Sequence, residues 1–170
     1  MPRKNFCFGC GKDNPQGMKL KFRYDEAGKR FVCNFRLARR YAGPPGYAHG
    51  GIIATILDEA MAKLNKPRQV LAVTSKMEVR YLRPVPLGRP LTVESREVRV
   101  RGRAHIYAAE IRDGAGQALA TSRGKFIKVD PARVFGTQAG NAVQRLNAQR
   151  KKSERRDPST PLGFASLRSG

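Results

Sequence analysis

The stretch GYAHGGIIATILDEAMAKL, residues 46–64, decides the fold because its apolar residues recur at steps of three, four and seven. That is the period of a helix and not of a strand. The apolar positions are Ile53, Ile56, Leu57, Ala60, Met61 and Leu64. A helix that is apolar on most of its circumference must be covered on several sides. We therefore expect one long central helix with a curved antiparallel sheet wrapped around it.

Short β-rich runs flank this helix in the sequence. LKFRY and RFVCNFRL precede it, and VLAVTSKMEVRYLRP, residues 91–100, 104–112 and 117–129 follow it. The first run after the helix alternates one apolar set with one charged set: Met77, Val79 and Tyr81 against Lys76, Glu78 and Arg80. Such alternation is typical of a half-buried strand. The links RGR and DGAG suit hairpins, so we predict an α+β domain whose last four strands form a meander.

Composition divides the 170 residues into three parts. Residues 1–18 are rich in turn-forming residues, and residues 19–130 hold the predicted sheet and helix. Residues 131–170 are polar and basic, and we expect a flexible tail with at most a short helix near 141–155. The length favours a single folded domain.

The chain is strongly basic, with 34 Lys and Arg against 13 Asp and Glu and a net charge of +21. Residues 1–129 alone hold 26 basic and 10 acidic residues, so the tail is not the whole source. This charge attracts polyanions such as nucleic acid, anionic membranes or phosphorylated cofactors.

An odd count of three cysteines and no apolar signal segment after Met1 predict a cytoplasmic protein with free thiols. No apolar run approaches the roughly 18 residues that span a bilayer.

Asp58 is a carboxylate on this otherwise apolar helix. At 100° per residue it falls at about 140° from Ile53, beside the most apolar stripe, where desolvation would raise its pKa and make it a better base. The alternative is an ordinary surface residue on the open face of an amphipathic helix. The His-Gly-Gly at the helix start favours a site, because backbone N–H groups at a helix N-terminus stabilise developing negative charge.

The helix itself limits how these groups can work together. Gly51 and Asp58 are separated by on the order of 10 Å along the axis, at about 1.5 Å rise per residue. One reacting carbon cannot lie about 3 Å from both. If both act, they come from two copies of the chain, related by a two-fold axis. The sequence thus predicts a site at a homodimer interface.

The segment GPPGYAHGGIIATILDEAMA, followed by TSKMEVRYLRPVPLG, resembles the hot-dog-fold acyl-CoA thioesterase superfamily, in particular the branch of phenylacetyl-CoA-type and human thioesterase-superfamily proteins. The likeness covers roughly residues 6–129 and includes CFGCGKDNPQGMKLKF. Its most specific part is the His-Gly-Gly motif with an acidic residue nine positions after the histidine. The resemblance implies hydrolysis of an acyl-CoA without a metal or redox cofactor. It also implies a homodimer at minimum, which relatives often pair into a tetramer.

The same resemblance implies roles for individual residues. Asp58 would be the general base or nucleophile, and the amide of Gly50 or Gly51 would polarise the thioester carbonyl. His49 would help hold that carbonyl or orient the loop. Thr74, sixteen positions after Asp58, matches the threonine that helps place the attacking water in the human relatives. Other branches carry an Asn a few residues before the motif, but position 43 is Gly, so that contribution is absent or replaced.

Two further groups of residues invite a functional interpretation. Cys7 and Cys10 form a CxxC, but zinc needs about four ligands and no second Cys or His pair has matching spacing, so we expect no metal. A redox motif would need a helix after the cysteines, and GKDNPQG is typical of a turn.

Four arginines near strand ends or in a hairpin could bind the phosphates of coenzyme A, or could be solvated surface: Arg80, Arg83, Arg101 and Arg103. Of these, Arg83 and Arg103 are the preferred pair.

Two other functions fit the sequence. The same fold can bind acyl-CoA as a non-catalytic regulator, although Asp58, Gly51 and Thr74 argue against it. The basic tail could bind nucleic acid, but Phe135 and Phe164 are its only aromatic residues, which leaves base stacking unsupported.

Overall fold

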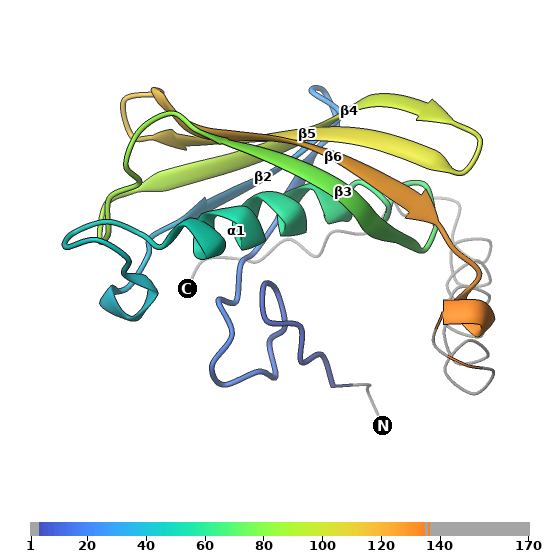
Figure 1. Cartoon of the computed structure of the whole chain (residues 1–170), viewed down its shortest axis with the longest axis horizontal. Coiled ribbons are helices and arrows are strands. Elements are labelled where there is room, and N and C mark those ends of the chain that lie inside the picture. The colour runs from blue at the N-terminus through green and yellow to red at the C-terminus, as the bar shows by residue number, and fades with distance from the viewer. Residues whose placement is uncertain (1–3, 135, 137–170) are drawn as a thin grey trace.

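The structure, a computed structural model, describes residues 4–134 and residue 136. A curved antiparallel sheet lies against one face of a single long helix, α1 (Figure 1). The elements are β1 (Arg23–Asp25), β2 (Arg30–Phe35), a 3-10 turn (Arg39–Tyr41), α1 (Gly50–Lys63), β3 (Ala72–Tyr81), β4 (Leu91–Arg101), β5 (Ala104–Asp113) and β6 (Ala118–Lys128). The predicted fold class, a sheet wrapped around one central helix, is confirmed. Within the described residues no helix is long and apolar enough to cross a membrane.

The strand order is β1-β2-β4-β5-β6-β3, with every neighbouring pair antiparallel. The two predicted hairpins join β4 to β5 and β5 to β6, and each has a glycine with positive φ, Gly102 at 56° and Gly116 at 82°. The prediction of a four-strand meander is wrong in one respect, because β3 pairs with β6 and not with β4. Residues 82–90, which join β3 to β4, exceed the two to five residues or so of a hairpin loop. They carry the chain from the edge of the sheet to its middle, which leaves β3 as an edge strand.

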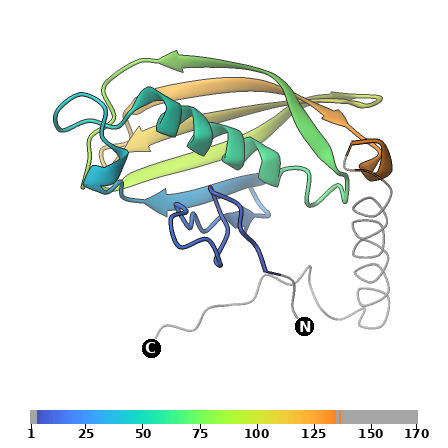
Figure 2. The same ribbon diagram turned by 60° about the horizontal axis from the view of Figure 1, so that its bottom comes forward.

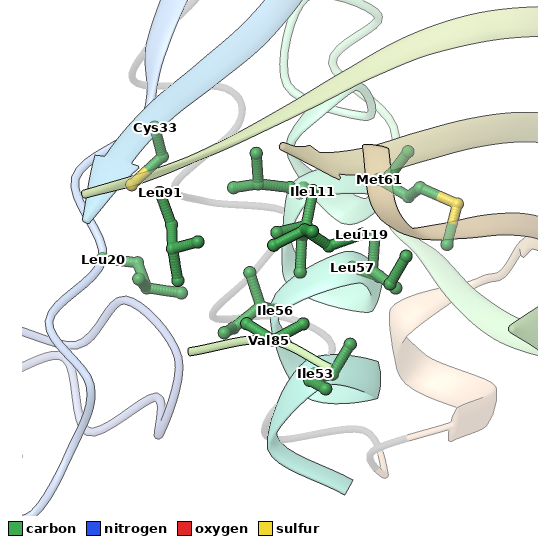
Figure 3. Packing of buried hydrophobic residues seen from close by; sticks show 14 of the residues in the cluster. Leu20, Cys33, Ile53, Ile56, Leu57, Met61, Val85, Leu91, Ile111 and Leu119 are labelled. Carbon is green, nitrogen blue, oxygen red and sulfur yellow. The ribbon is translucent and has the colours of Figure 1, made fainter. Parts of the chain in front are cut away.

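The core lies between α1 and the concave face of the sheet. Ile56, Leu57, Ala60 and Met61 are completely buried, as the helical spacing predicted. They pack with Ile111 and Leu119 of the sheet and with Val85 from the connection between β3 and β4 (Figure 3). Burying each of these large side chains contributes about 1.5–3 kcal/mol, which fixes the helix rigidly on the sheet.

Hydrogen bonds between buried polar groups also hold the helix on the sheet. The hydroxyl of Tyr107, a fully buried residue, donates a 2.9 Å hydrogen bond to Oδ1 of Asn65 and lies 2.9 Å from Nδ1 of His105. Ser95 donates a 2.6 Å bond to the carbonyl of Ala60 on α1. These bonds tie the helix and the residues just beyond its end to β4 and β5. Sliding the helix along the sheet would leave these buried polar groups without partners.

The lead-in segment lies against α1 on the side away from β3, so that the helix is flanked by both (Figure 2). Its backbone is closed by internal bonds, including Gly11 N–H to the Cys7 carbonyl at 2.9 Å and Asp13 N–H to the Asn5 carbonyl at 3.1 Å. The described part of the lead-in segment, residues 4–18, is therefore a folded loop closed by its own backbone hydrogen bonds. The tail predicted for residues 131–170, with its short helix near 141–155, lies almost entirely outside the described residues.

Candidate active site at the helix and the edge strand

The helix N-terminus is capped by the histidine of the His-Gly-Gly motif. His49 is the N-cap, and its Nδ1 accepts a 3.0 Å hydrogen bond from the Gly51 N–H. The Gly51 amide is therefore already engaged, whereas the Gly50 N–H has no hydrogen-bond partner among the described residues. A free N–H at the first position of a helix is suited to an anionic oxygen. Between the two glycines the geometry favours Gly50 as the donor.

The loop before the helix holds His49 in place. Its backbone N–H donates to the Tyr41 carbonyl at 2.9 Å, and the neighbouring Ala48 N–H donates to the Val85 carbonyl at 2.9 Å. Gly43 packs directly on this backbone, where an added Cβ would lie 2.9 Å from Cα of His49. A side chain at position 43 would therefore displace the backbone of His49 in this chain.

Tyr81, which sequence reasoning did not single out as a site residue, reaches the helix N-terminus from the end of β3. Its hydroxyl donates a 3.0 Å hydrogen bond to the Gly50 carbonyl, while its side chain stays 54% exposed. The alternating pattern of residues 76–81 predicts Tyr81 on the buried face with Met77 and Val79. It is exposed because β3 is an edge strand and Tyr81 is its last residue. Its position at the end of an alternating strand was the only signal in the sequence.

Two turns further along the helix, Asp58 contacts the start of the same strand. The Thr74 hydroxyl donates a 2.7 Å hydrogen bond to Oδ1 of Asp58. Burial raises the pKa of Asp58 above its ordinary value, the bond from Thr74 partly lowers it, and the neighbouring Glu59 carboxylate raises it. Asp58 is half-buried, as its place beside the apolar stripe indicated. A carboxylate with a raised pKa and a fixed orientation is suited to accept a proton from water.

A β-bulge sets the direction of Thr74. The pairing of β3 with β6 shifts between Thr74 and Lys76, which leaves Ser75 as the extra residue. Without the bulge Thr74 would share the outward face with Lys76 and Glu78, because side chains alternate along a strand. The extra residue turns Thr74 toward the helix. The structure therefore brings the side chains of Asp58 and Thr74 together.

The two groups of candidate residues lie at opposite ends of β3. Thr74 pairs with Phe126 near the end of β6, and Tyr81 pairs with Ala120 near its start. Seven residues of strand separate Thr74 from Tyr81 by about 23 Å, at about 3.3 Å per residue. Asp58 and Gly50 themselves lie about 12 Å apart along α1, at about 1.5 Å rise per residue, so within one chain Asp58 cannot act on a carbonyl held at Gly50.

The four candidate arginines follow the same division. Arg80 and Arg83 lie beside Tyr81, and Arg83 Nη1 donates to the Ala118 carbonyl at 3.4 Å. Arg101 and Arg103 lie in the β4–β5 hairpin, where Arg103 Nε donates to the Lys128 carbonyl at 3.2 Å. Arg101 and Arg103 are therefore at the Thr74 end of the sheet. The preferred pair, Arg83 and Arg103, is not brought together within one chain.

A third group of polar residues lies on the opposite side of α1 from β3. The donor atoms of Cys7, Cys10 and Glu59 all lie within 4.8 Å of one another. Burial and the nearby Glu59 raise the pKa of the Cys10 thiol to about 11, despite the neighbouring Lys63. The expectation of no metal counted only cysteine and histidine pairs, and Glu59 lies too far along the chain for a spacing rule to include it.

One long helix packed on the concave face of a curved six-stranded antiparallel sheet, with a carboxylate and a glycine-rich helix start facing an edge strand, defines a hot-dog-fold protein. Residues 45–120 match the family model of the thioesterase superfamily. The chain belongs to this superfamily of hot-dog-fold proteins.

Individual relatives agree with this assignment. The chain is 32% identical over 116 residues to the rat protein named acyl-coenzyme A thioesterase THEM4. The aligned region covers 68% of this chain and 50% of the rat protein. It is 31% identical to the crystal structure of RHA08564, a thioesterase superfamily protein, with a TM-score of 0.65 and coverage of 69% and 60%. A Streptococcus mutans protein, smu.793, solved with acetyl-CoA bound, has the same fold at 20% identity and a TM-score of 0.60, with coverage of 65% and 88%. The chain spans about half the length of the curated relatives it matches.

Proposed function

We propose that this protein is an acyl-CoA thioesterase that hydrolyses its substrate to a free acid and coenzyme A. The observation that carries the proposal is the hydrogen bond from Thr74 to Asp58, which orients a half-buried carboxylate beside the edge strand. The rat relative named an acyl-coenzyme A thioesterase supports the activity, and the acetyl-CoA bound to smu.793 supports the substrate class.

In the proposed reaction Asp58 accepts a proton from a water molecule that the Thr74 hydroxyl helps to place. The water oxygen attacks the thioester carbon, and the carbonyl oxygen becomes negatively charged. The Gly50 N–H, at the positive end of the helix dipole, stabilises that oxyanion. The tetrahedral intermediate then collapses, the carbon–sulfur bond breaks, and the proton passes from Asp58 to the departing thiolate of coenzyme A. A direct attack by Asp58 through an acyl-aspartyl anhydride uses the same groups.

Asp58 contacts one end of β3 through Thr74, and Gly50 contacts the other end through Tyr81. The proposed reaction therefore requires two chains. An antiparallel pairing of two β3 edges would bring Thr74 and Asp58 of one protomer to the region of Gly50 and Tyr81 of its partner. Three features support such a pairing: the open edge of the ten-residue strand β3, the exposure of Tyr81 and the exposure of Leu82. A homodimer is then the smallest active unit, and a tetramer of two such dimers keeps the same sites.

The same pairing explains the split arrangement of the arginines. Arg83 of one protomer would approach Arg103 of its partner, next to the reacting centre. Guanidinium groups bind phosphate oxygens through paired hydrogen bonds, and coenzyme A carries a pyrophosphate and a 3′-phosphate. We assign Arg80, Arg83, Arg101 and Arg103 to coenzyme A binding on this basis.

The test is a panel of acyl-CoA esters, assayed by thiol release with the wild-type chain and with Asp58→Asn. The substitution keeps the size of the side chain and removes its basicity, so turnover should fall by orders of magnitude while the oligomer stays intact. Asp130→Asn is the matched control, because this exposed carboxylate caps the Ala132 N–H, which lies outside the site. Wild-type binding of acyl-CoA without hydrolysis of any ester, or near-normal turnover in Asp58→Asn, would contradict the proposal.

A further inference from the structure

The cluster on the lead-in side of α1 joins four chemically active groups that the hydrolytic site does not use. Cys7 Sγ lies 3.4 Å from Glu59 Oε2, and Lys63 Nζ lies 2.8 Å from Cys10 Sγ. Lys63 Nζ also forms an ion pair with Glu59 Oε1 at 2.6 Å. Two sulfur atoms and a carboxylate from segments about 50 residues apart therefore converge on one point.

Glu59 uses its two carboxylate oxygens for different partners. Oε1 is held by Lys63, whereas Oε2 faces the cysteines. One oxygen is thus available for coordination while the other remains fixed by a charged donor. Metal-binding carboxylates are commonly oriented by a second hydrogen bond in this way.

The distances suit a tetrahedral zinc ion. Bonds of about 2.3 Å to sulfur and about 2.0 Å to oxygen place neighbouring ligand atoms roughly 3.5–3.8 Å apart. Cys7 Sγ and Glu59 Oε2 are 3.4 Å apart, and all three donor atoms lie within 4.8 Å of one another. An ion could therefore bind with shifts of about 1 Å or less in side-chain positions.

Charge also favours a divalent cation. Two thiolates and one carboxylate carry three negative charges, which one Zn²⁺ and the Lys63 ammonium neutralise together. Lys63 is 8% exposed, so the cluster lies where an uncompensated charge would be costly. Cys7 is exposed, which gives an ion a path from solvent and leaves a fourth position for water.

The lead-in loop is shaped around Glu59. A Cβ added to Gly9, between the two cysteines, would lie 2.8 Å from Glu59 Oε2, so a side chain there would force the Glu59 carboxylate to shift. Gly11 is constrained more strictly, because its Cβ would lie 2.5 Å from backbone atoms of Cys7 and Asn5. The glycines of CFGCG therefore present both thiols to the carboxylate.

We propose that Cys7, Cys10 and Glu59 bind a zinc ion that fastens the lead-in segment to α1, with Lys63 holding Glu59 and the Cys10 sulfur. Binding replaces two thiol protons with one Zn²⁺, and no oxidant or reductant is consumed. The site is separate from the proposed hydrolytic residues, because Asp58 contacts β3 while the adjacent Glu59 contacts the lead-in segment.

The test uses the full-length chain, reduced with a phosphine and freed of metal by a chelator. Cobalt(II) is titrated first, because thiolate ligation gives it an intense charge-transfer absorption, and Zn²⁺ is then measured by competition with a chromophoric chelator. We expect one ion per chain, a thiolate-to-cobalt band that Zn²⁺ abolishes, and a higher melting temperature with Zn²⁺. Cys7→Ser and Glu59→Gln should each weaken Zn²⁺ binding by at least about tenfold.

Two variants serve as matched controls. Cys33→Ala removes the thiol outside the cluster, and Asp58→Asn removes the neighbouring carboxylate, so both should bind the ion as the wild type does. Cys7 is exposed, so Cys7→Ser should fold, which circular dichroism checks. Folded, reduced wild-type protein without the cobalt band, or unchanged affinity in Cys7→Ser, would overturn the proposal. Purification as a metal-free Cys7–Cys10 disulfide that reforms after reduction would also overturn it.

Discussion

The hydroxyl of Thr74 donates a 2.7 Å hydrogen bond to Oδ1 of Asp58, across the boundary between the edge strand and the helix. This contact depends on the bulge at Ser75, which turns Thr74 toward α1. It fixes the direction of the carboxylate and partly opposes the rise in its pKa that burial causes. The same bond therefore controls both the geometry and the basicity of Asp58.

Replacing Thr74 with valine should shift the pH dependence of hydrolysis. Without the donor, the pKa of Asp58 rises further above its ordinary value, so the base is ionised only at higher pH. We expect the acidic limb of the profile of kcat/KM against pH to move upward, together with a fall in kcat. Thr74→Ser keeps the hydroxyl and should leave the limb in place. Identical profiles for Thr74→Val and the wild type would refute the proposed role of this bond.

Gly50 permits a substitution that removes only the proposed oxyanion donor. It is the first residue of α1, where proline is well tolerated, and His49 before it has φ −64° and ψ 138°, which suits a residue before proline. Gly50→Pro deletes the N–H and should lower kcat by about 10²–10³-fold with the fold intact. Gly50→Ala is the control, since its Cβ would meet Tyr81 at an ordinary 3.5 Å and the N–H remains. Equal kcat in the two variants would exclude the Gly50 amide as a donor.

The hydroxyl of Tyr107 should matter for stability rather than for chemistry. Tyr107→Phe leaves Asn65 and His105 without their shared partner in the core. We expect the free energy of unfolding, measured with urea, to fall by about 1–3 kcal/mol. Tyr47→Phe removes a hydroxyl from a side chain that is 42% exposed and should have little effect. Unchanged stability in Tyr107→Phe would show that the buried pairing contributes nothing.

The helix and most of the core could be predicted from sequence because apolar spacing reports directly which side chains are buried. Strand neighbours could not, since alternation shows that β3 has one inner face but not that it pairs with β6. Thr74 illustrates a second limit, because strict alternation would have turned it outward and only the bulge brings it to Asp58. Tyr81 and Glu59 were missed as site residues because their partners, the Gly50 carbonyl and the lead-in loop, come together only in the folded chain.

The central claim is that Asp58 of one protomer works with Gly50 of the other. The most direct test is a dimer with one Asp58→Asn chain and one Gly50→Pro chain, isolated through two different affinity tags. Such a dimer has one site with both substitutions and one site with neither, so it should regain about half of the wild-type turnover. The two parent homodimers should each remain nearly inactive. A mixed dimer no more active than its parents would contradict the account, because it would place Asp58 and Gly50 of one site on the same chain.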